Sequence, residues 1–169
     1  MAAIVTLIVI ALGAYLVFFV FFPLARGAIY DPSSPVETRI MVEMATVVRG
    51  ERAADLGSGD GRVVIELAQA GAEAHGFEVN PLLVLMSRRN IRKAGLAGKA
   101  RIHWGSFWRR DLSGFDIVTV FQVGFVMGRL QTKLQRELPA RARVISHYWR
   151  FPGLTPESTR GSIYRYRLG

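Results

Sequence analysis

The sequence predicts an α/β fold in which a mostly parallel sheet carries helices on both faces and one transmembrane helix precedes the domain. From Arg52 onward, short apolar runs of strand length alternate with stretches of helical periodicity, which is typical of repeated strand–helix–strand units. Before Arg26, the chain has a long apolar run without a charged side chain. The length of 169 residues allows one domain and a short additional element.

The apolar run at residues 2–22 predicts a membrane anchor spanning residues 1–25, because about 20 helical residues cross the roughly 30 Å hydrocarbon layer. A cleaved signal peptide is the main alternative. It normally has a basic start and a shorter apolar core, whereas no Lys or Arg precedes this run and Pro23 ends it. Arginines follow the run, so the rest of the chain is expected on the cytoplasmic side, or on the matrix side of a mitochondrial membrane.

The composition restricts the partners and the chemistry. Lys and Arg number 22 against 13 Asp and Glu, which gives a net charge of +9 and suggests an anionic neighbour. Because an apolar segment is present, the lipid bilayer is favoured over nucleic acid as that neighbour. The absence of cysteine excludes disulfides, thiolate catalysis and zinc sites with Cys ligands. The three histidines have no metal-ligand spacing, so no metal site is predicted.

Residues 26–50 are expected to form a linker and a leading helix, and residues 51–169 a single domain. Ser34 followed by Pro35 is a plausible start for a helix over residues 36–48. Residues 148–161 lack a helical pattern, so the fold is expected to be trimmed toward its C-terminal end. The expected strands are residues 52–56, 72–78, 100–104, 115–121, 142–147 and 162–168, and the expected helices are residues 61–70, 81–94 and 125–138.

The motif with the strongest chemical meaning is Asp55-Leu56-Gly57-Ser58-Gly59-Asp60-Gly61, between an expected strand and an expected helix. Glycines let the backbone turn sharply and approach a ligand, and the N–H groups of the following helix favour negative charge. The third glycine comes one position too early for a dinucleotide fingerprint. An acidic residue before G-x-G-x-G instead resembles the cofactor loop of class I methyltransferases, which bind S-adenosylmethionine on a Rossmann-like fold. A structural strand–helix turn is the alternative interpretation.

A second acidic position supports this interpretation. Glu78 is at the expected end of the next strand, about 20 residues after the loop, where a carboxylate can accept both ribose hydroxyls of a nucleoside. Asn80 follows it and is included among the candidate cofactor-binding residues, together with Ser58 of the loop.

The chain also resembles a narrower family, the membrane-associated protein lysine methyltransferases of the ATP synthase c-subunit and of the adenine nucleotide translocase. The resemblance covers nearly the whole part of the chain after the apolar run. It runs through the stretches Tyr30-Asp31-Pro32-Ser33, DLGSGDGRVVIELA (55–68), GFEVNPLLV (76–84), VFQVGFVMGRLQTKLQRELPARARVIS (120–146) and Arg150-Phe151-Pro152. It implies methylation of a lysine ε-amine on a protein, with small membrane proteins among the expected substrates.

The resemblance also implies roles for particular residues. The cofactor would be held by Asp55, Gly57, Gly59 and Glu78. The lysine channel would be lined by Phe121-Gln122-Val123, and Tyr30 would cover the site, so Gln122 and Tyr30 are the candidate catalytic residues.

The adenine end of the site departs from the family pattern. Ser106 stands where relatives commonly carry an acidic residue, and we expect Ser106 to bind adenine while Phe107 or Trp108 stacks on it. Asp31 is likewise an unusual second residue of the tyrosine motif.

Alternatives remain open at this stage. Gln122 either orients the amine through its side-chain carbonyl or merely ends a strand, and no general base is assigned. An RNA or small-molecule methyltransferase would share the same fold, although the stretch Phe121-Gln122-Val123-Gly124 differs from the N-P-P-Y-like tetrapeptide that favours base amines. A membrane-tethered module that binds the cofactor without turnover is a third possibility.

Overall fold

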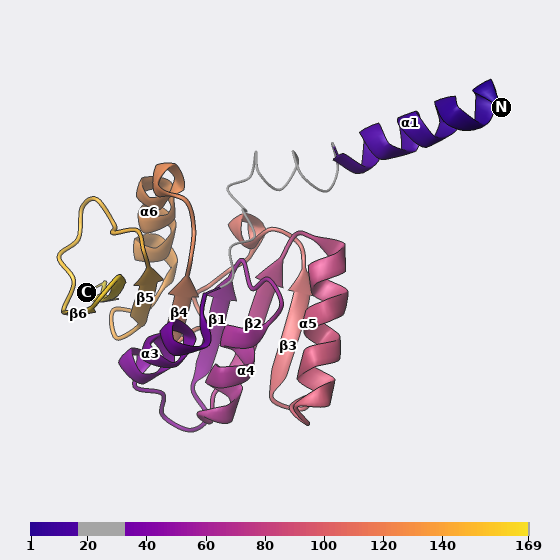
Figure 1. The fold of residues 1–169 in the computed structure, drawn as a ribbon. Helices are drawn as coiled ribbons and strands as arrows, with labels where there is room; N and C mark the ends of the chain where they lie inside the picture. The colour runs from indigo at the N-terminus through magenta and orange to yellow at the C-terminus, as the bar shows by residue number, and fades with distance from the viewer. Residues whose placement is uncertain (17–32, 169) are drawn as a thin grey trace.

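The computed structural model describes residues 1–16 and 33–168 and contains one seven-stranded mixed sheet (Figure 1). The strands lie in the order β3-β2-β1-β4-β5-β7-β6. The first five strands are parallel, whereas β7 is antiparallel to both β5 and β6. The strand bounds are β1 Arg52–Leu56, β2 Glu73–Glu78, β3 Ala100–Trp104, β4 Ile117–Val120, β5 Arg143–His147, β6 Ser158–Arg160 and β7 Ile163–Arg167.

Helices cover both faces of the sheet, and the sheet separates two apolar cores (Figure 1). One face carries α3 (Pro35–Ala45), α4 (Arg62–Gln69) and α5 (Pro81–Lys93). The other face carries α6 (Met127–Glu137) and the short 3-10 helix η2 (Phe107–Arg109). The central strands are buried along nearly their whole length, as expected for parallel strands between two helical layers.

The predicted α/β fold with a mostly parallel sheet and helices on both faces is confirmed, and the expected helices and strands lie close to their predicted bounds. Two features differ. The strand β6 was not predicted, because its three residues are all exposed and show no periodicity. The helix expected at residues 125–138 begins with a separate 3-10 turn, η3 (Gly124–Val126). From residue 148 to residue 157 the chain forms turns and irregular structure, as expected for a stretch without a helical pattern.

The first helix, α1 (Ala2–Leu16), lies within the predicted transmembrane segment. Apolar side chains such as Ile4, Leu7 and Ile10 are more than half exposed along it, and none of the α1 side chains that the structure describes belongs to either core. Among residues 1–16 and 33–168, no helix is both long enough and apolar enough to span a bilayer. The remainder of the predicted segment, residues 17–25, lies outside the described residues.

The leading helix α3 starts as predicted, with Ser34 as its N-cap and Pro35 in its first turn. The Ser34 side chain accepts from the Glu37 N–H, and the Glu37 carboxylate accepts from the Ser34 N–H, which is a capping box. The helix ends at Thr46, which has φ 47°.

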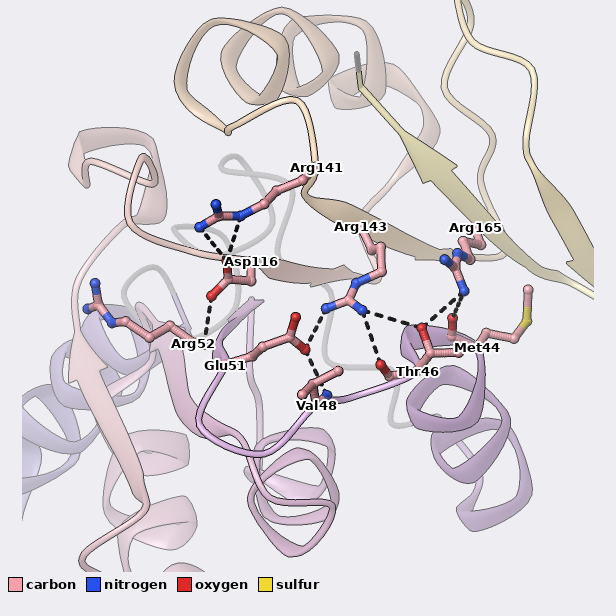
Figure 2. A network of polar contacts seen from close by, with 9 residues as sticks. All are labelled: Met44, Thr46, Val48, Glu51, Arg52, Asp116, Arg141, Arg143 and Arg165. Atoms are coloured by element: carbon pink, nitrogen blue, oxygen red, sulfur yellow. Dashed lines mark hydrogen bonds and ion pairs between the residues drawn. The ribbon is translucent and has the colours of Figure 1, made fainter.

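Arginines from the sheet bind the C-terminal end of α3 at the edge where the parallel strands begin (Figure 2). Arg143 donates to the Thr46 carbonyl and Arg165 to the Met44 carbonyl, where cations stabilise a helix. The rest of this network comprises Val48, Glu51, Arg52, Asp116 and Arg141.

Candidate active site

The order of the strands determines where a ligand binds. Chain connections from β1 run outward to β2 and β3, whereas β4 and β5 lie on the other side of β1. In open α/β sheets, ligands bind in the crevice at the carboxyl ends of the strands, at the point where the order reverses. Here that point lies between β1 and β4. The glycine loop after β1, Glu78 at the end of β2 and Gln122 after β4 all lie at this edge.

The glycine loop has the backbone geometry that the sequence predicts. Gly57, Gly59 and Gly61 have φ angles of 88°, 51° and 84°, in the left-handed region that favours glycine. A Cβ on Gly57 would lie 2.5 Å from Gln122 Nε2. A side chain at position 57 would therefore be strained by this backbone angle and would displace the Gln122 amide.

Glu78 fastens the loop to β2. It is 5% exposed, and its two oxygens accept from the N–H groups of Gly59 (2.9 Å) and Asn80 (2.8 Å). Each carboxylate oxygen has a second lone pair, so Glu78 retains acceptor capacity for the hydroxyls of a ribose. Asn80 also N-caps α5, because its side chain accepts from the Leu82 N–H. The Asn80 side chain thus caps α5, while its backbone N–H orients the Glu78 carboxylate.

Asp55 is buried at the end of β1 and accepts a hydrogen bond of 2.7 Å from the Thr119 hydroxyl of β4. Burial raises the pKa of Asp55 from its usual 3.8 to about 7, and the carboxylates of Glu78 and Asp60 add to the rise, whereas the Thr119 hydrogen bond opposes it. The charge at this position therefore changes near neutral pH and is sensitive to a cation bound above it.

Gln122 is 5% exposed, and its side-chain nitrogen donates to the Leu56 carbonyl at 2.8 Å. This contact fixes the amide between the ends of β1 and β4. Gln122 contributes to a small pocket that contains several of the predicted residues. The pocket is lined by Gly57, Phe77, Glu78, Val79, Ser106, Phe107, Trp108 and Gln122.

The remaining predicted residues have different surroundings. The Ser58 side chain lies against β2, where a Cβ on Gly76 would be 2.5 Å from its hydroxyl, and the Ser58 N–H donates to the Phe77 carbonyl of the same strand. Ser106 caps η2 by accepting from the Trp108 N–H, and Phe107 is buried beneath the pocket. Tyr30 lies outside the described residues.

Two residues that bear on the site were not singled out from the sequence. Thr119 binds Asp55 across β1 and β4, and the continuous apolar run around it, which is buried throughout β4, gives no sign of this contact. Val79 also lines the pocket. It directly follows Glu78, so the predicted role of Glu78 could have pointed to it.

The comparisons with known proteins agree with this geometry. Residues 55–158 match the model of the ANTKMT methyltransferase domain. The chain belongs to the ANTKMT methyltransferase family. It is 37% identical over 132 residues to the lysine N-methyltransferase of the ATP synthase c-subunit from Homo sapiens, a match that covers 77% of this chain and 57% of that protein. The chain thus spans little more than half the length of that relative.

Two further relatives are covered almost completely. A protein-lysine N-methyltransferase of Saccharolobus islandicus is 35% identical over 150 residues, which are 83% of this chain and 93% of that protein. The crystal structure of an RNA methyltransferase from Salinibacter ruber, in complex with S-adenosyl-L-homocysteine, has a TM-score of 0.79 and 30% identity and covers 82% of this chain and 94% of that one.

The cofactor of this ANTKMT family domain is S-adenosylmethionine, as the resemblance implies. The residues present fit it. The loop at Gly57 excludes a side chain, Glu78 retains lone pairs at the end of β2, and Phe107 and Trp108 provide aromatic surface in the same pocket.

Proposed function

We propose that the protein transfers the methyl group of S-adenosylmethionine to the ε-amine of a lysine in a membrane protein. The single observation that carries the proposal is the pocket that joins Gly57, Glu78 and Gln122 at the carboxyl edge of the sheet. The names of two relatives, each a lysine N-methyltransferase, support the acceptor class.

The residues of the chain mainly align and exclude water. When bound, S-adenosylmethionine supplies an electrophilic methyl group on a sulfonium, so the protein needs no strong nucleophile of its own. A lysine amine must be neutral to react, and its pKa in water is about 10.4. A dry channel beside a cation lowers that pKa. In this proposal Gln122, whose side chain donates to the Leu56 carbonyl, and Phe121 form the wall of such a channel.

We further propose that the N-terminal segment associates with the bilayer and that the domain faces the cytoplasm or the mitochondrial matrix. The support is the row of exposed apolar side chains on α1, which water solvates poorly. The arginines that follow it favour this orientation. Recovery in the membrane fraction after alkaline extraction, and protease protection in sealed vesicles, test the two statements separately.

RNA is the second candidate acceptor, because one surface of the domain suits it. An open groove next to the pocket is lined by Trp108, Arg109, Arg110, Phe125 and Arg129 among others, and the Arg129 guanidinium lies 4.6 Å from the centre of the Trp108 ring. Arginine beside exposed aromatic rings is typical of single-stranded nucleic acid sites. The Salinibacter ruber relative, named an RNA methyltransferase, adds to this alternative.

One experiment separates the acceptors. The full chain, solubilised in detergent, is incubated with methyl-tritiated S-adenosylmethionine, membranes and total RNA. We expect label in a membrane protein and, after hydrolysis, in methylated lysine. Glu78→Gln should abolish the label, whereas Glu66→Gln on α4 should not. Label that is sensitive to ribonuclease would overturn the lysine proposal.

A further inference from the structure

His147 has hydrogen-bonding partners that the amino-acid sequence does not reveal. It ends β5, is 4% exposed, and both of its ring nitrogens have partners. Nδ1 lies 3.0 Å from the Ser33 hydroxyl, and Nε2 lies 3.2 Å from a carboxylate oxygen of Glu37. Ser33 and His147 are 114 residues apart, so the contact joins the segment before α3 to the carboxyl edge of the sheet.

Glu37 determines how the His147 ring is held. The backbone N–H of Ser34, together with the Ser34 side chain, holds the pKa of Glu37 below its usual value, so that this carboxylate is ionised at neutral pH. An ionised carboxylate only accepts hydrogen bonds, and His147 Nε2 therefore carries the proton. In the neutral ring, Nδ1 then accepts from the Ser33 hydroxyl, and the ring can neither flip nor rotate without losing both contacts.

The ring of His147 packs on Phe121, with 4.4 Å between the ring centres. Phe121 directly follows β4 and precedes Gln122. The main chain after His147 is also constrained. The Trp149 N–H donates to the His147 carbonyl, and Tyr148 between them has φ 68°, a tight γ-turn that is rare for a residue other than glycine. Such local strain is found chiefly where the surroundings hold a functional geometry in place.

Ser33 is also connected to the glycine loop through Arg62 of α4. Its carbonyl accepts from Arg62 Nη1 at 2.5 Å, and Arg62 forms an ion pair of 2.7 Å with Asp60 of the loop. Ser33 is 7% exposed. One buried serine thus connects the cofactor side of the site, through Arg62, with the side that carries Phe121, through His147.

We propose that Ser33 and His147 are positioning residues, whose hydrogen bond sets Phe121 in register with the glycine loop. The proposal rests on the proposed function in that Phe121 is assigned to the acceptor channel. Neither residue touches the reacting atoms. Their role is to hold the acceptor wall in place against the cofactor loop.

The sharpest test compares Ser33→Ala with Ser33→Thr in the full chain, because only the second keeps the hydroxyl. Initial rates are measured with tritiated cofactor against increasing amounts of membranes. In Ser33→Ala we expect the apparent KM for membranes to rise about tenfold. We expect Ser33→Thr to stay near the wild type, and the dissociation constant of S-adenosylhomocysteine to stay within about twofold in both variants.

Ser113→Ala is the matched control, since it also loses one hydroxyl bond, to Asp111, in the loop before β4. A purely structural role predicts a different pattern. Misfolded protein lowers kcat in proportion to the inactive fraction and leaves KM unchanged. That pattern in Ser33→Ala, or an unchanged KM, would overturn the proposal. If Ser33→Thr does not fold, a second pair of variants is used. His147→Asn keeps an acceptor for the Ser33 hydroxyl and should behave like the wild type, whereas His147→Leu loses it and should show the raised KM.

A second measurement needs no turnover. In protein labelled with ¹⁵N-histidine, we expect the His147 ring to be the Nε2–H tautomer and its Nδ1 signal to shift in Ser33→Ala. Addition of S-adenosylhomocysteine should move the His147 signals in the wild type and not in Ser33→Ala. If the wild type methylates no lysine, the proposed function fails. The His147 signals still decide whether Ser33 connects His147 to the cofactor loop. His147 signals indifferent to Ser33 would refute the connection itself.

Discussion

At the scale of single residues, the site combines a position that accepts no other residue with a position whose side chain changes its charge near neutral pH. Gly57 belongs to the first kind, because its φ of 88° and the nearby Gln122 side chain both exclude a Cβ. Asp55 belongs to the second kind, since its carboxyl is buried and has a pKa of about 7. A ligand cation bound above the loop therefore lies beside a constrained backbone and beside the Asp55 carboxyl, which can ionise in response to the positive charge.

Gly57→Ala should abolish cofactor binding. The new methyl group would lie 2.5 Å from Gln122 Nε2, so Gln122 would be displaced into the pocket. Gly50→Ala is the control, because Gly50 has nearly the same φ of 89° with no atom within 4 Å of the added Cβ. We expect Gly50→Ala to lose about 1 kcal/mol of stability and to bind S-adenosylhomocysteine normally in calorimetry. Equal binding by both alanine variants would contradict the assigned pocket.

Asp55→Asn should change how stability depends on pH. The folded-state pKa of Asp55 is about 7, above its usual 3.8, so the fold favours the protonated acid. The free energy of unfolding therefore falls as the pH rises between these two values. Asparagine cannot ionise and keeps an oxygen for Thr119. Between pH 5 and pH 8 the variant should gain roughly 2–3 kcal/mol relative to the wild type in urea unfolding. Parallel stability profiles would show that Asp55 titrates normally.

At the scale of elements, α3 is attached to the sheet at both of its ends. Its N-terminus lies beside His147 through Glu37, and its C-terminal carbonyls accept from Arg143 and Arg165 (Figure 2). The first attachment lies at the edge of the candidate site, and the second lies at the opposite edge, where the parallel strands begin. A change at the second should therefore alter stability without altering binding.

Arg143→Met tests this separation. The Arg143 side chain is 11% exposed and lies 2.5 Å from Glu51, so its removal leaves a partly buried carboxylate without its partner. We expect a loss of about 2 kcal/mol in the free energy of unfolding and an unchanged affinity for S-adenosylhomocysteine. Arg160→Met removes a similar contact, to Glu43, from an exposed position and should cost less than about 0.5 kcal/mol. A large loss of affinity in Arg143→Met would mean that the two edges are coupled.

The same elements show how far sequence reasoning extends. Short apolar runs located the parallel strands, because these strands are buried on both faces. Helical periodicity located the helices, because each buries one face, as Leu130 and Leu134 do in α6. Both signals failed for β6, whose residues are all exposed. The loop and Glu78 were predicted from residue type and spacing. The contacts Thr119–Asp55 and Ser33–His147 were not, because they join residues 64 and 114 positions apart, and no local pattern encodes such a pairing.

At the scale of the whole molecule, the described chain consists of a domain whose two cores are complete without α1 and an apolar helix that contributes to neither. The domain carries the candidate site, so we expect that it folds and binds the cofactor without the helix. Under the proposed association with the bilayer, the helix would change where the domain resides. The proposed acceptor is a membrane protein, and a domain kept at the bilayer meets such an acceptor at a much higher local concentration.

Deletion of residues 1–16 should therefore separate location from chemistry. Because α1 packs in neither core, we expect the melting midpoint and the affinity for S-adenosylhomocysteine to match those of the full chain. The truncated protein should leave the membrane fraction, and its rate of methyl transfer to membranes should fall, since the tether no longer concentrates it beside its acceptor. As a control, Arg160→Met in the full chain should remain with the membranes and keep its rate. A lowered melting midpoint after the deletion would instead mean that α1 stabilises the domain, and an undiminished rate would mean that the acceptor is reached from solution.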